Sequence, residues 1–560
     1  MNNTTELSKY SESNVGFDNV DSSKMFRVYF DETTRKFRII TSSRDVFELL
    51  KKNFTTANKN AFFINNYGYN VSDEVSIIND FGFFPVGMVF EILEYIKLTY
   101  GTLSCVYMSQ KCKDYVWDYL LPLRSVKEKL LHDPNFKVLN ISDDSGKNAK
   151  LLSEGKNPYK LRDYQENAIK ALMFDGCGRG IVELPTSSGK SFLIANFIYN
   201  LQKFYKSSLK VLIFVPNRLL VDQMYGDLLE YGFKEDEITK LAGGIKKSER
   251  QYDPNASVII SNRDYTFKNK EKLPKIDVLF TDEVHQVAPK SRTLDFIENL
   301  DCKIKVGCSG TVPREKFHRW TLTGAFGKTV YSEAITDLQN RGFITKINLK
   351  YISIIDENVE NNRNYLFNLN SNRKYNPNHP EDVMFDEAYK QELEYIKSNY
   401  EDLYVPVFEE IKKLNRNVLV LFDKIEFGSN VYNLAKDQNL RGSNIMYIDG
   451  STEMKERELV KQELEKSDNN ILFANVQIMG TGVSINNIDN LVFMFSSKSA
   501  PRVIQSIGRV LRRHKDKEIA NVLDINFNFK YSQKHFSERK SMYRQVYHKT
   551  NPDEIKTIRI

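Results

Sequence analysis

The sequence has few cysteines and no long apolar run. Its five cysteines are odd in number and form no Cys-x-x-Cys pair, which favours reduced intracellular thiols and argues against a zinc cluster. No uncharged apolar run reaches the roughly 18 residues that a membrane span requires. The first residues, MNNTTELSKYSESN, lack the apolar segment of a secretory signal. We therefore expect a cytoplasmic protein that has no membrane partner.

Charge of either sign is not in large excess, but the balance differs along the chain. The 560 residues carry a net charge of +7, with 41% apolar and 27% charged residues, an ordinary globular composition. From residue 501 onward 14 Lys/Arg stand against 6 Asp/Glu, so this part carries the whole excess. Such a surplus suits contact with a polyanion, and a solvated basic face without a partner is the alternative. The length predicts three or four domains.

The stretch IVELPTSSGKSFLIANF, residues 181–197, predicts a strand, a turn and a helix. In that geometry the turn amides and the helix N-terminus form a phosphate site, with Lys190 reaching the outer phosphates and the Ser191 hydroxyl a bound Mg²⁺. The first glycine of a full phosphate loop is missing, because Leu184 stands at its position. The expected nucleotide-binding residues are Pro185, Thr186, Ser187, Ser188, Gly189, Lys190 and Ser191.

A second Gly-Lys-Thr, at 327–329, lacks this context. Arg319-Trp320-Thr321 comes shortly before it, and the β-branched pair Thr329-Val330 ends it. We expect a strand edge there and no nucleotide site.

Beyond residue 159, short apolar segments alternate with longer helical patterns in two blocks. The first contains LKVLIFVP, ASVIIS, IDVLFTDE and KIKVGCSG, and the second NVLVLFD, NIMYIDG, NILFANV, NLVFMF and IANVLDI. Strands that are buried on both faces and separated by helices are typical of parallel, doubly wound sheets. We therefore predict an α/β fold with two such lobes in tandem.

The segments around these blocks complete the expected organisation. FRVYFDETTRKFRIIT predicts a hairpin and VGMVFEILEYIKLTY a helix, which together indicate a small α+β domain. The expected parts are a flexible N-terminus (1–22), this accessory domain (23–140), a polar linker (141–158), a first lobe that binds ATP (159–340), a second lobe (341–530) with an Asn-rich insertion near 356–382, and a basic C-terminal extension (531–560).

The C-terminal segment FKYSQKHFSERKSMYRQVYHK has two interpretations. Its Lys/Arg residues interleave with Phe, Tyr and His, a composition that can hold phosphates and stack on bases. Alternatively it is a helix that packs Phe536, Tyr543 and Tyr547 against the second lobe.

An acid pair follows the apolar segment IDVLF. Ligands of parallel sheets bind at the carboxyl ends of strands, where Asp282 and Glu283 stand. Downstream of a phosphate loop, this pair suits ATP hydrolysis. Asp282 would hold Mg²⁺ through water, and Glu283 would orient and deprotonate the attacking water.

With these motifs in order, the chain resembles the superfamily-two helicases and translocases of the Asp-Glu-x-His type, from residue 159 to beyond 513. The resemblance implies two RecA-like lobes. In YKLRDYQ, Gln165 would bond the adenine edge while Tyr159 or Arg162 flanks it, with ordinary packing as the alternative for Tyr159. CSGTVPR matches the motif that couples nucleotide state to lobe movement, and the coupling residues expected from the resemblance are His285, Ser309 and Thr311.

Three further segments resemble the family's nucleic-acid motifs. VPNRLLVDQ and IISNRD resemble segments of the first lobe that hold a strand, and ANVQIMGTGVSI resembles the motif in which Gly480-Thr481-Gly482 faces both strand and nucleotide. The expected nucleic-acid contacts are Pro216, Asn217, Arg218, Ser261, Asn262 and Thr481, with Gly480 at the nucleotide.

QSIGRVLRR has the family's Gln-x-x-Gly-Arg-x-x-Arg spacing. On a helix, Gln505, Arg509 and Arg512 are four and three residues apart, so they share one face, which is catalytic by resemblance. Arg512, with Arg509 beside it, would be the arginine finger, a contribution of roughly a thousandfold or more in phosphoryl transfer. A solvated charged stripe is the alternative.

We therefore expect an ATP-dependent DNA helicase or translocase with ATP and Mg²⁺ as cofactors. It is most similar to the UvsW-type recombination helicases of phages, which remodel branched DNA by unwinding, fork regression and branch migration, and which would act in the bacterial host cytoplasm. RNA is the less expected track. The alternatives are the motor subunit of a restriction or defence complex, an RNA helicase, and a nucleic-acid clamp that does not hydrolyse ATP.

Overall fold

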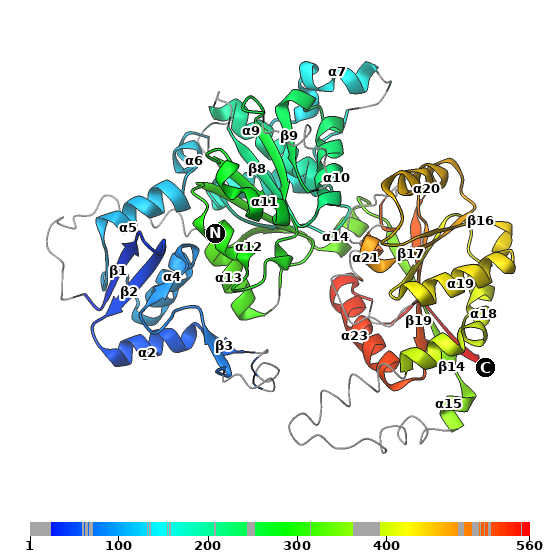
Figure 1. Ribbon diagram of the computed structural model, residues 1–560. Coiled ribbons are helices and arrows are strands. Elements are labelled where there is room, and N and C mark those ends of the chain that lie inside the picture. The colour runs from blue at the N-terminus through cyan, green and yellow to red at the C-terminus, as the bar shows by residue number, and fades with distance from the viewer. Residues whose placement is uncertain are drawn as a thin grey trace. The chain divides into compact units, whose positions relative to one another are not determined.

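A computed structural model divides the chain into two units (Figure 1). The first unit comprises Met1–Leu184 and Gly189–Ser332, and the second comprises Glu333–Ile560 with the turn Pro185–Ser188. The expected flexible N-terminus and most of the Asn-rich insertion lie outside the described residues. The structure describes residues 24–58, 61, 65, 71–130, 133, 136–153, 155, 158–205, 209–243, 253–313, 315–361, 392–479, 487–494, 503, 506–508, 510–512, 517–549 and 551–560.

The first unit contains a seven-stranded sheet in the order β13-β7-β12-β11-β8-β10-β9, in which every pair is parallel. Its central strands are buried on both faces, as the apolar segments predict. The second Gly-Lys-Thr leads into edge strand β13, which begins at its Thr329, as expected. The strands are β7 (Arg179–Glu183), β8 (Val211–Val215), β9 (Ile238–Leu241), β10 (Val258–Asn262), β11 (Val278–Thr281), β12 (Ile304–Ser309) and β13 (Thr329–Ser332).

Helices connect these strands, so each crossover has the length that a parallel pair requires. They contribute apolar side chains to a core that contains Phe214, Leu279 and Phe326. The helices are α8 (Asp163–Lys170), η4 (Ala171–Asp175), α9 (Lys190–Tyr205), α10 (Arg218–Glu230), η5 (Glu235–Glu237), α11 (Arg263–Asn269), η7 (Lys270–Lys272), η8 (Val284–Gln286), α12 (Arg292–Asn299) and α13 (Lys316–Phe326).

The second unit contains another seven-stranded, all-parallel sheet, in the order β16-β17-β15-β18-β19-β14-β20. Two doubly wound parallel sheets confirm the predicted fold class. The strands are β14 (Lys346–Ile355), β15 (Val418–Phe422), β16 (Asn444–Ile448), β17 (Asn470–Asn475), β18 (Asn490–Phe493), β19 (Ile519–Phe527) and β20 (Glu554–Arg559), and the helices are α14 (Ile335–Asn340), α15 (Glu357–Asn361), α18 (Tyr400–Ile411), α19 (Ile425–Asp437), η9 (Leu440–Gly442), α20 (Met454–Lys466), α21 (Val476–Met479) and α23 (Lys530–Tyr547).

The C-terminal segment belongs to the second unit's sheet. Phe536, Tyr543 and Tyr547 on α23 are 6%, 0% and 3% exposed, which supports the packing interpretation of this helix. Tyr543 also donates its hydroxyl to Asp524, whose carboxylate pairs with buried Arg539. Strand β20 then pairs with β14, so residues 531–560 form a helix and an edge strand of the sheet where we expected a separate extension.

The N-terminal domain is a four-stranded mixed sheet, β5-β2-β1-β6, with helices on one face (blue in Figure 1). Strands β1 and β2 form the predicted hairpin, and α4 coincides with the predicted helix. The elements are β1 (Phe26–Asp31), β2 (Lys36–Thr41), α2 (Arg44–Asn53), β3 (Thr55–Ala57), β4 (Glu74–Ser76), β5 (Phe83–Phe84), η1 (Val86–Met88), α4 (Val89–Tyr100), β6 (Val106–Met108), α5 (Gln110–Tyr115), η2 (Val116–Leu120) and α6 (Arg124–Leu130).

This domain packs directly on helix α13 of the first lobe. Phe317 and Trp320 of α13 join the domain's own core. Backbone meets backbone at two glycines: a Cβ on Gly87 would lie 2.3 Å from the Thr323 carbonyl oxygen, and one on Gly324 would lie 2.4 Å from Pro85. Glycine is required there because no side chain fits, and the close packing explains why domain and lobe form a single unit.

The expected linker 141–158 is partly structured. Residues Ile141–Asp143 form η3 and Ser145–Ser153 form α7, and Ile141 is fully buried. Asn196 on α9 accepts a hydrogen bond from the Ile141 amide at 2.8 Å, and Asn200 does the same for Leu139 at 2.9 Å. The polar composition predicted a linker here, and these side chains of α9 hold the chain in place where it begins.

None of the helices within the described residues is both long enough and apolar enough to cross a membrane.

Candidate nucleotide and nucleic-acid site

The phosphate-loop candidate is the turn between β7 and α9, as predicted. The Leu184 amide donates to the Ser309 carbonyl at 2.9 Å, which fixes the start of the turn to β12. Ser187 and Gly189 have φ values of +69° and +79°, which tighten the turn before the helix begins at Lys190. The Lys190 ammonium donates to the Leu184 carbonyl at 3.2 Å, so it folds back over its own turn, where a phosphate would lie.

Gln165 lies against this turn. Its side chain is 3% exposed, accepts from the Arg162 amide at 3.0 Å and donates to the Gly189 carbonyl at 3.2 Å. A Cβ on Gly189 would lie 2.6 Å from the Gln165 amide nitrogen, so glycine is needed for this contact. The structure therefore brings the expected adenine-binding residue next to the expected phosphate loop.

Tyr159 and Arg162 are the expected flanking residues. The Tyr159 hydroxyl bonds to Glu230, and its ring packs on Phe192 and Tyr231, with centroids 5.8 and 5.5 Å away. With 40% of its surface exposed, one side of Tyr159 remains available to a base. Arg162 donates to the Tyr164 hydroxyl at 3.0 Å.

The Ser191 hydroxyl lies 3.1 Å from the Tyr231 hydroxyl. Tyr231 is partly buried, and burial raises the pKa of its phenol, so the phenol stays neutral. The Ser191 oxygen keeps a free lone pair whichever hydroxyl donates in this hydrogen bond, so it can also ligate a cation.

The acid pair follows β11 at the carboxyl edge of the same sheet. The Asp282 amide donates to the Phe214 carbonyl at 3.1 Å, and the Glu283 amide donates to the Asp282 carboxylate at 2.9 Å. Burial and the neighbouring Glu283 charge raise the pKa of Asp282, while the Lys190 ammonium opposes them. Glu283 has a left-handed backbone, φ +51°, a costly conformation for a non-glycine residue that is typical of functional turns.

A polar chain links Glu283 to the end of β12. His285 Nδ1 lies 3.2 Å from Glu283 Oε2 and 2.9 Å from Ser309 Oγ. The Ser309 hydroxyl donates its only hydrogen to the Thr311 carbonyl at 2.6 Å. The hydrogen between His285 and Ser309 must therefore sit on Nδ1, so the imidazole donates to Ser309, while Glu283 Oε2 lies close to the same nitrogen. All three expected coupling residues thus connect to the acid pair.

The side-chain oxygens of Asp282 and Ser191 fit a magnesium ion. Mg²⁺ is bound by one or two carboxylates together with substrate phosphates and water. Asp282 offers a buried carboxylate that the negative charge of its neighbour Glu283 repels. A cation bound there would relieve this repulsion.

Arg263 was not among the predicted residues. It begins α11 directly after β10, and burial lowers the pKa of its guanidinium, which interacts with the Glu283 charge. Among the described residues, its Nε and Nη2 atoms are buried and have no hydrogen-bond partner. Buried guanidinium nitrogens without hydrogen bonds are costly, so an acceptor anion at this edge would be stabilised. An arginine directly after a buried strand was the available signal in the sequence.

The residues expected to contact nucleic acid fall into two groups, one at the start of α10 and one at the end of β10. Asn217 caps α10 by accepting from the Leu220 amide at 3.1 Å, and Arg218 lies on the first turn with 46% of its side chain exposed. Ser261 is fully buried, and its hydroxyl bonds to the Leu241 carbonyl and to Thr266. Its side chain therefore does not reach a nucleic-acid strand, contrary to expectation. Its hydroxyl ties β10 to β9 and α11. Pro216 is partly exposed, and Asn262 is 5% exposed with a buried Oδ1 that has no partner in the described region.

Most candidates of the second unit lie outside the described residues, namely Gly480, Thr481, Gln505 and Arg509. Arg512 is described and is partly buried. The Leu511 carbonyl before it accepts from the Thr345 amide at 3.0 Å.

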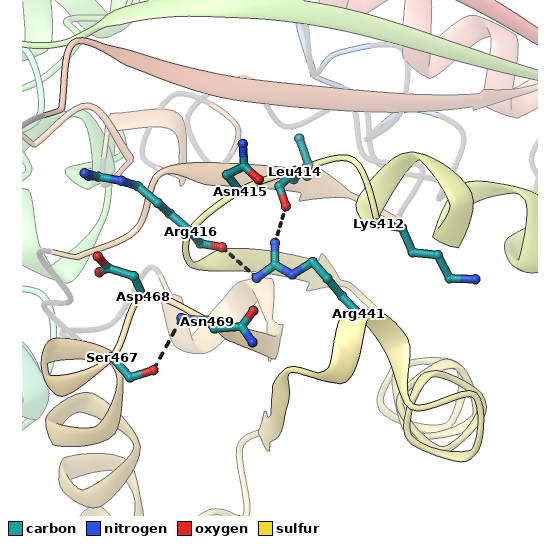
Figure 2. A pocket seen from close by; sticks show the side chains of 8 residues that line it. All are labelled: Lys412, Leu414, Asn415, Arg416, Arg441, Ser467, Asp468 and Asn469. Carbon is teal, nitrogen blue, oxygen red and sulfur yellow. Dashed lines mark hydrogen bonds between the residues drawn. The ribbon is translucent and has the colours of Figure 1, made fainter.

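A pocket in the second unit lies at the amino-terminal edge of its sheet, before β15, β16 and β17 (Figure 2). Arg441 donates to the carbonyls of Leu414 and Arg416, the latter at 2.8 Å, and Lys412 lines the rim. These residues precede β15, β16 and β17, whereas ligands of such sheets bind at the carboxyl ends. The two bonds of Arg441 hold loops together, so we do not place the candidate site here.

Comparisons with known proteins agree with this geometry. Residues 158–314 match the model of the Type III restriction enzyme res subunit, and residues 402–514 match the helicase conserved C-terminal domain. The ATP-dependent DNA helicase uvsW of Enterobacteria phage T4 is 26% identical over 368 residues, which span 65% of this chain and 67% of that protein.

Two other matches are more distant. Putative helicase 22 of a Sulfolobus islandicus filamentous virus is 25% identical over 66% of this chain and 65% of its own length. The DNA-bound Type ISP restriction-modification enzyme LlaBIII has a similar fold, with a TM-score of 0.53 and 15% identity over 72% of this chain and 31% of that one.

The matched models cover the first lobe with the phosphate turn, the acid pair and Ser309, and the part of the second unit that ends beyond Arg512. The chain is therefore a helicase of superfamily two, an enzyme that uses ATP and acts on nucleic acid.

Proposed function

We propose that the protein is a DNA translocase and helicase of the UvsW type that remodels branched DNA in recombination, replication and repair of a phage. The similarity to a phage DNA helicase supports this assignment. The observation that carries it is the polar chain from Glu283 through His285 to Ser309 at the edge that also holds the phosphate turn. It joins the acid of ATP hydrolysis to a loop that can move.

In this proposal the residues of the first unit divide the work. Lys190 neutralises the outer phosphates, and Gln165 bonds the adenine edge beside Tyr159 or Arg162. Asp282 and Ser191 would hold Mg²⁺, which would neutralise charge that develops on the phosphates. Glu283 accepts the proton of the attacking water, and His285, whose Nδ1 lies 3.2 Å from Glu283 Oε2, stands beside the carboxylate.

Coupling follows from the same contacts. A shift of the Ser309–Thr311 turn changes the acceptor of the His285 hydrogen and therefore the position of Glu283. Binding energy of the DNA strand can be used in this way to switch hydrolysis on. In the second unit, Gln505, Arg509 and Arg512 supply the donors and positive charge that stabilise phosphoryl transfer, as the motif spacing predicts.

DNA contacts are expected from Pro216, Asn217, Arg218, Asn262 and Thr481. Contacts to phosphates make binding tolerant of sequence and sensitive to salt. Ser261 is not retained in this set because its hydroxyl is buried.

A second candidate function is the motor subunit of a restriction or defence complex. The match of residues 158–314 to a restriction-enzyme subunit favours it. Such a subunit would hydrolyse ATP on DNA only after a partner protein is added, whereas the proposed helicase acts alone.

The test is an ATPase assay of wild type and Lys190→Ala with no nucleic acid, single-stranded, duplex, forked and four-way DNA, and RNA. We expect turnover that depends on DNA and is highest on branched substrates, and loss of it in the variant with an unchanged melting temperature. Stimulation by RNA alone would replace DNA as the track. DNA binding without any hydrolysis would identify a clamp, and activity that needs a partner would favour the restriction motor.

A further inference from the structure

The N-terminal sheet has two faces of opposite character. Along β1, Phe26 and Val28 point into the core, while Arg27 and Tyr29 alternate with them and lie on the other face. Within the described residues, helices α2, α4 and α5 contribute their buried side chains to the core face. The other face carries the set that we call the basic-aromatic face, namely Arg27, Tyr29, Arg38, Phe83 and Tyr107.

Strand register places these side chains side by side. Arg38 on β2 lies opposite Tyr29 on one neighbour and Phe83 on the other. Arg27 lies opposite Tyr107. The Tyr29 and Tyr107 rings have centroids 6.2 Å apart, and the Arg38 guanidinium lies 5.3 Å from the centre of the Phe83 ring. The face therefore sets flat rings beside guanidinium groups on four strands, with Ile40 opposite Arg27 on β2.

The charge of this face is positive. All five members are at least partly exposed, yet the Arg27 Nε is buried and, within the described chain, has no hydrogen-bond partner. The one acid on the same side of β1, Asp31, accepts from the Thr34 amide and hydroxyl at 2.7 and 2.8 Å. Its carboxylate is thus held by the hairpin turn, and an anionic ligand suits the two arginines.

An exposed phenylalanine stands at the edge of the face. Phe81 is 73% exposed, and its carbonyl accepts from Arg38 Nε at 3.0 Å. Its turn is rigid, because the Asn79 side chain accepts from the Phe81 and Phe83 amides at 3.0 and 2.9 Å. Gly82, at φ +82°, lies against the Ile39 carbonyl, where a Cβ would come within 2.2 Å. The ring is therefore held in solvent by a turn built for that position.

We propose that the basic-aromatic face, with Phe81 at its edge, binds single-stranded DNA by stacking bases on Tyr29, Tyr107 and Phe83 and by pairing phosphates with Arg27 and Arg38. Rings interleaved with cations are the arrangement that holds single strands without sequence preference. The glycine contacts with α13 make the domain one body with the first lobe, so a strand bound here is held in a fixed position relative to the ATP site of that lobe. The inference rests on the proposed DNA motor and adds a second strand-binding site to it.

The test uses the full-length Tyr29→Ala/Tyr107→Ala variant and fluorescence anisotropy on an oligothymidine strand. Stacking contributes about 1–3 kcal/mol per base, so we expect the Kd to rise at least about tenfold. The Tyr29→Phe/Tyr107→Phe variant keeps the rings and should bind like wild type. Tyr205→Ala, which removes an exposed tyrosine of α9, is the matched control and should also bind like wild type.

Salt dependence tests the phosphate contacts separately. For Arg27→Gln/Arg38→Gln, the slope of log K against log salt should fall by about 0.7 for each phosphate contact that is lost. Basal ATP turnover without DNA should be unchanged in all these variants, because the face lies in the accessory domain.

Two results would overturn the inference. One is that Tyr29→Ala/Tyr107→Ala has the Kd, and Arg27→Gln/Arg38→Gln the salt slope, of Tyr205→Ala. The other is that Tyr29→Ala/Tyr107→Ala loses as much affinity for a blunt duplex, which offers phosphates but no free bases. Either result, with wild type still stimulated by DNA, would reject the face and leave the motor intact. A wild type that no DNA stimulates would reject the proposed function instead.

Discussion

The two seven-stranded sheets share a topology, but polar side chains do different work at the carboxyl edge of the first and at the amino edge of the second. In the first unit, Asp282, Glu283 and Ser309 stand at the carboxyl ends of β11 and β12. In the second, Asn417 at the amino end of β15 donates to the carbonyls of Leu464, Ser467 and Asn487 and accepts from Asn470. The first set contains a residue with a left-handed backbone, Glu283, and a carboxyl with a raised pKa, Asp282. The second set only forms hydrogen bonds that hold loops together. We therefore assign catalysis to the first edge and a structural role to the second.

The largest expected effect compares two arginines of the second unit. Arg512→Gln should lower DNA-stimulated turnover by about a thousandfold, because it removes positive charge from phosphoryl transfer. Arg416→Asn changes an amino-edge arginine of the pocket in Figure 2, at a left-handed backbone that asparagine accepts, and should leave turnover within about twofold. Steady-state phosphate release measures both, and equal losses would remove the distinction between the edges.

The second prediction concerns the scaffold edge. Asn417 is fully buried, so Asn417→Ala leaves several carbonyls and amides without partners and should lower the free energy of unfolding of the second unit by about 3 kcal/mol. Exposed Asn415→Ala is the control and should change it by less than about 0.5 kcal/mol. Native-state hydrogen exchange of the β15 and β17 amides gives both values. Similar protection in the two variants would contradict the role of Asn417.

The smallest predicted effect is a pH dependence at the amino edge of the first sheet. Burial lowers the pKa of Lys305 on β12 to about 7, with Arg179 as a second cause. The unfolded chain, with a lysine pKa of about 10.4, binds more protons between these values, so stability rises with pH from about 7 to about 10.4 and is lowest below 7. Lys305→Met should therefore raise the melting temperature more at pH 6.5 than at pH 9. Exposed Lys303→Met should show no such difference, and equal shifts for Lys305→Met at both pH values would contradict the assignment.

Much of the fold was predictable because buried strands are written as continuous apolar segments. All nine segments of the two blocks are strands. Strand β20, EIKTIR, escaped because an edge strand is half exposed and reads as polar. The order in the predicted linker escaped for another reason: Asn200 and Asn196 bond the backbone of Leu139 and Ile141, and both lie on α9, which is distant in sequence.

The site was predictable at the level of motifs but not of partners. Spacing placed Lys190 on a turn and Asp282 after a strand, and both are found there. It did not show that His285 donates to Ser309, that Ser261 is buried, or that Arg263 approaches Glu283, because each depends on the packing of separate strands.

The most direct test of the central claim, that the carboxyl edge of the first sheet hydrolyses ATP in response to DNA, is the Glu283→Gln variant. We predict that it binds ATP with the wild-type Kd, while turnover on forked DNA falls by about a hundredfold or more because the general base is lost. Turnover close to wild type on forked DNA, with ATP bound normally, would contradict the account.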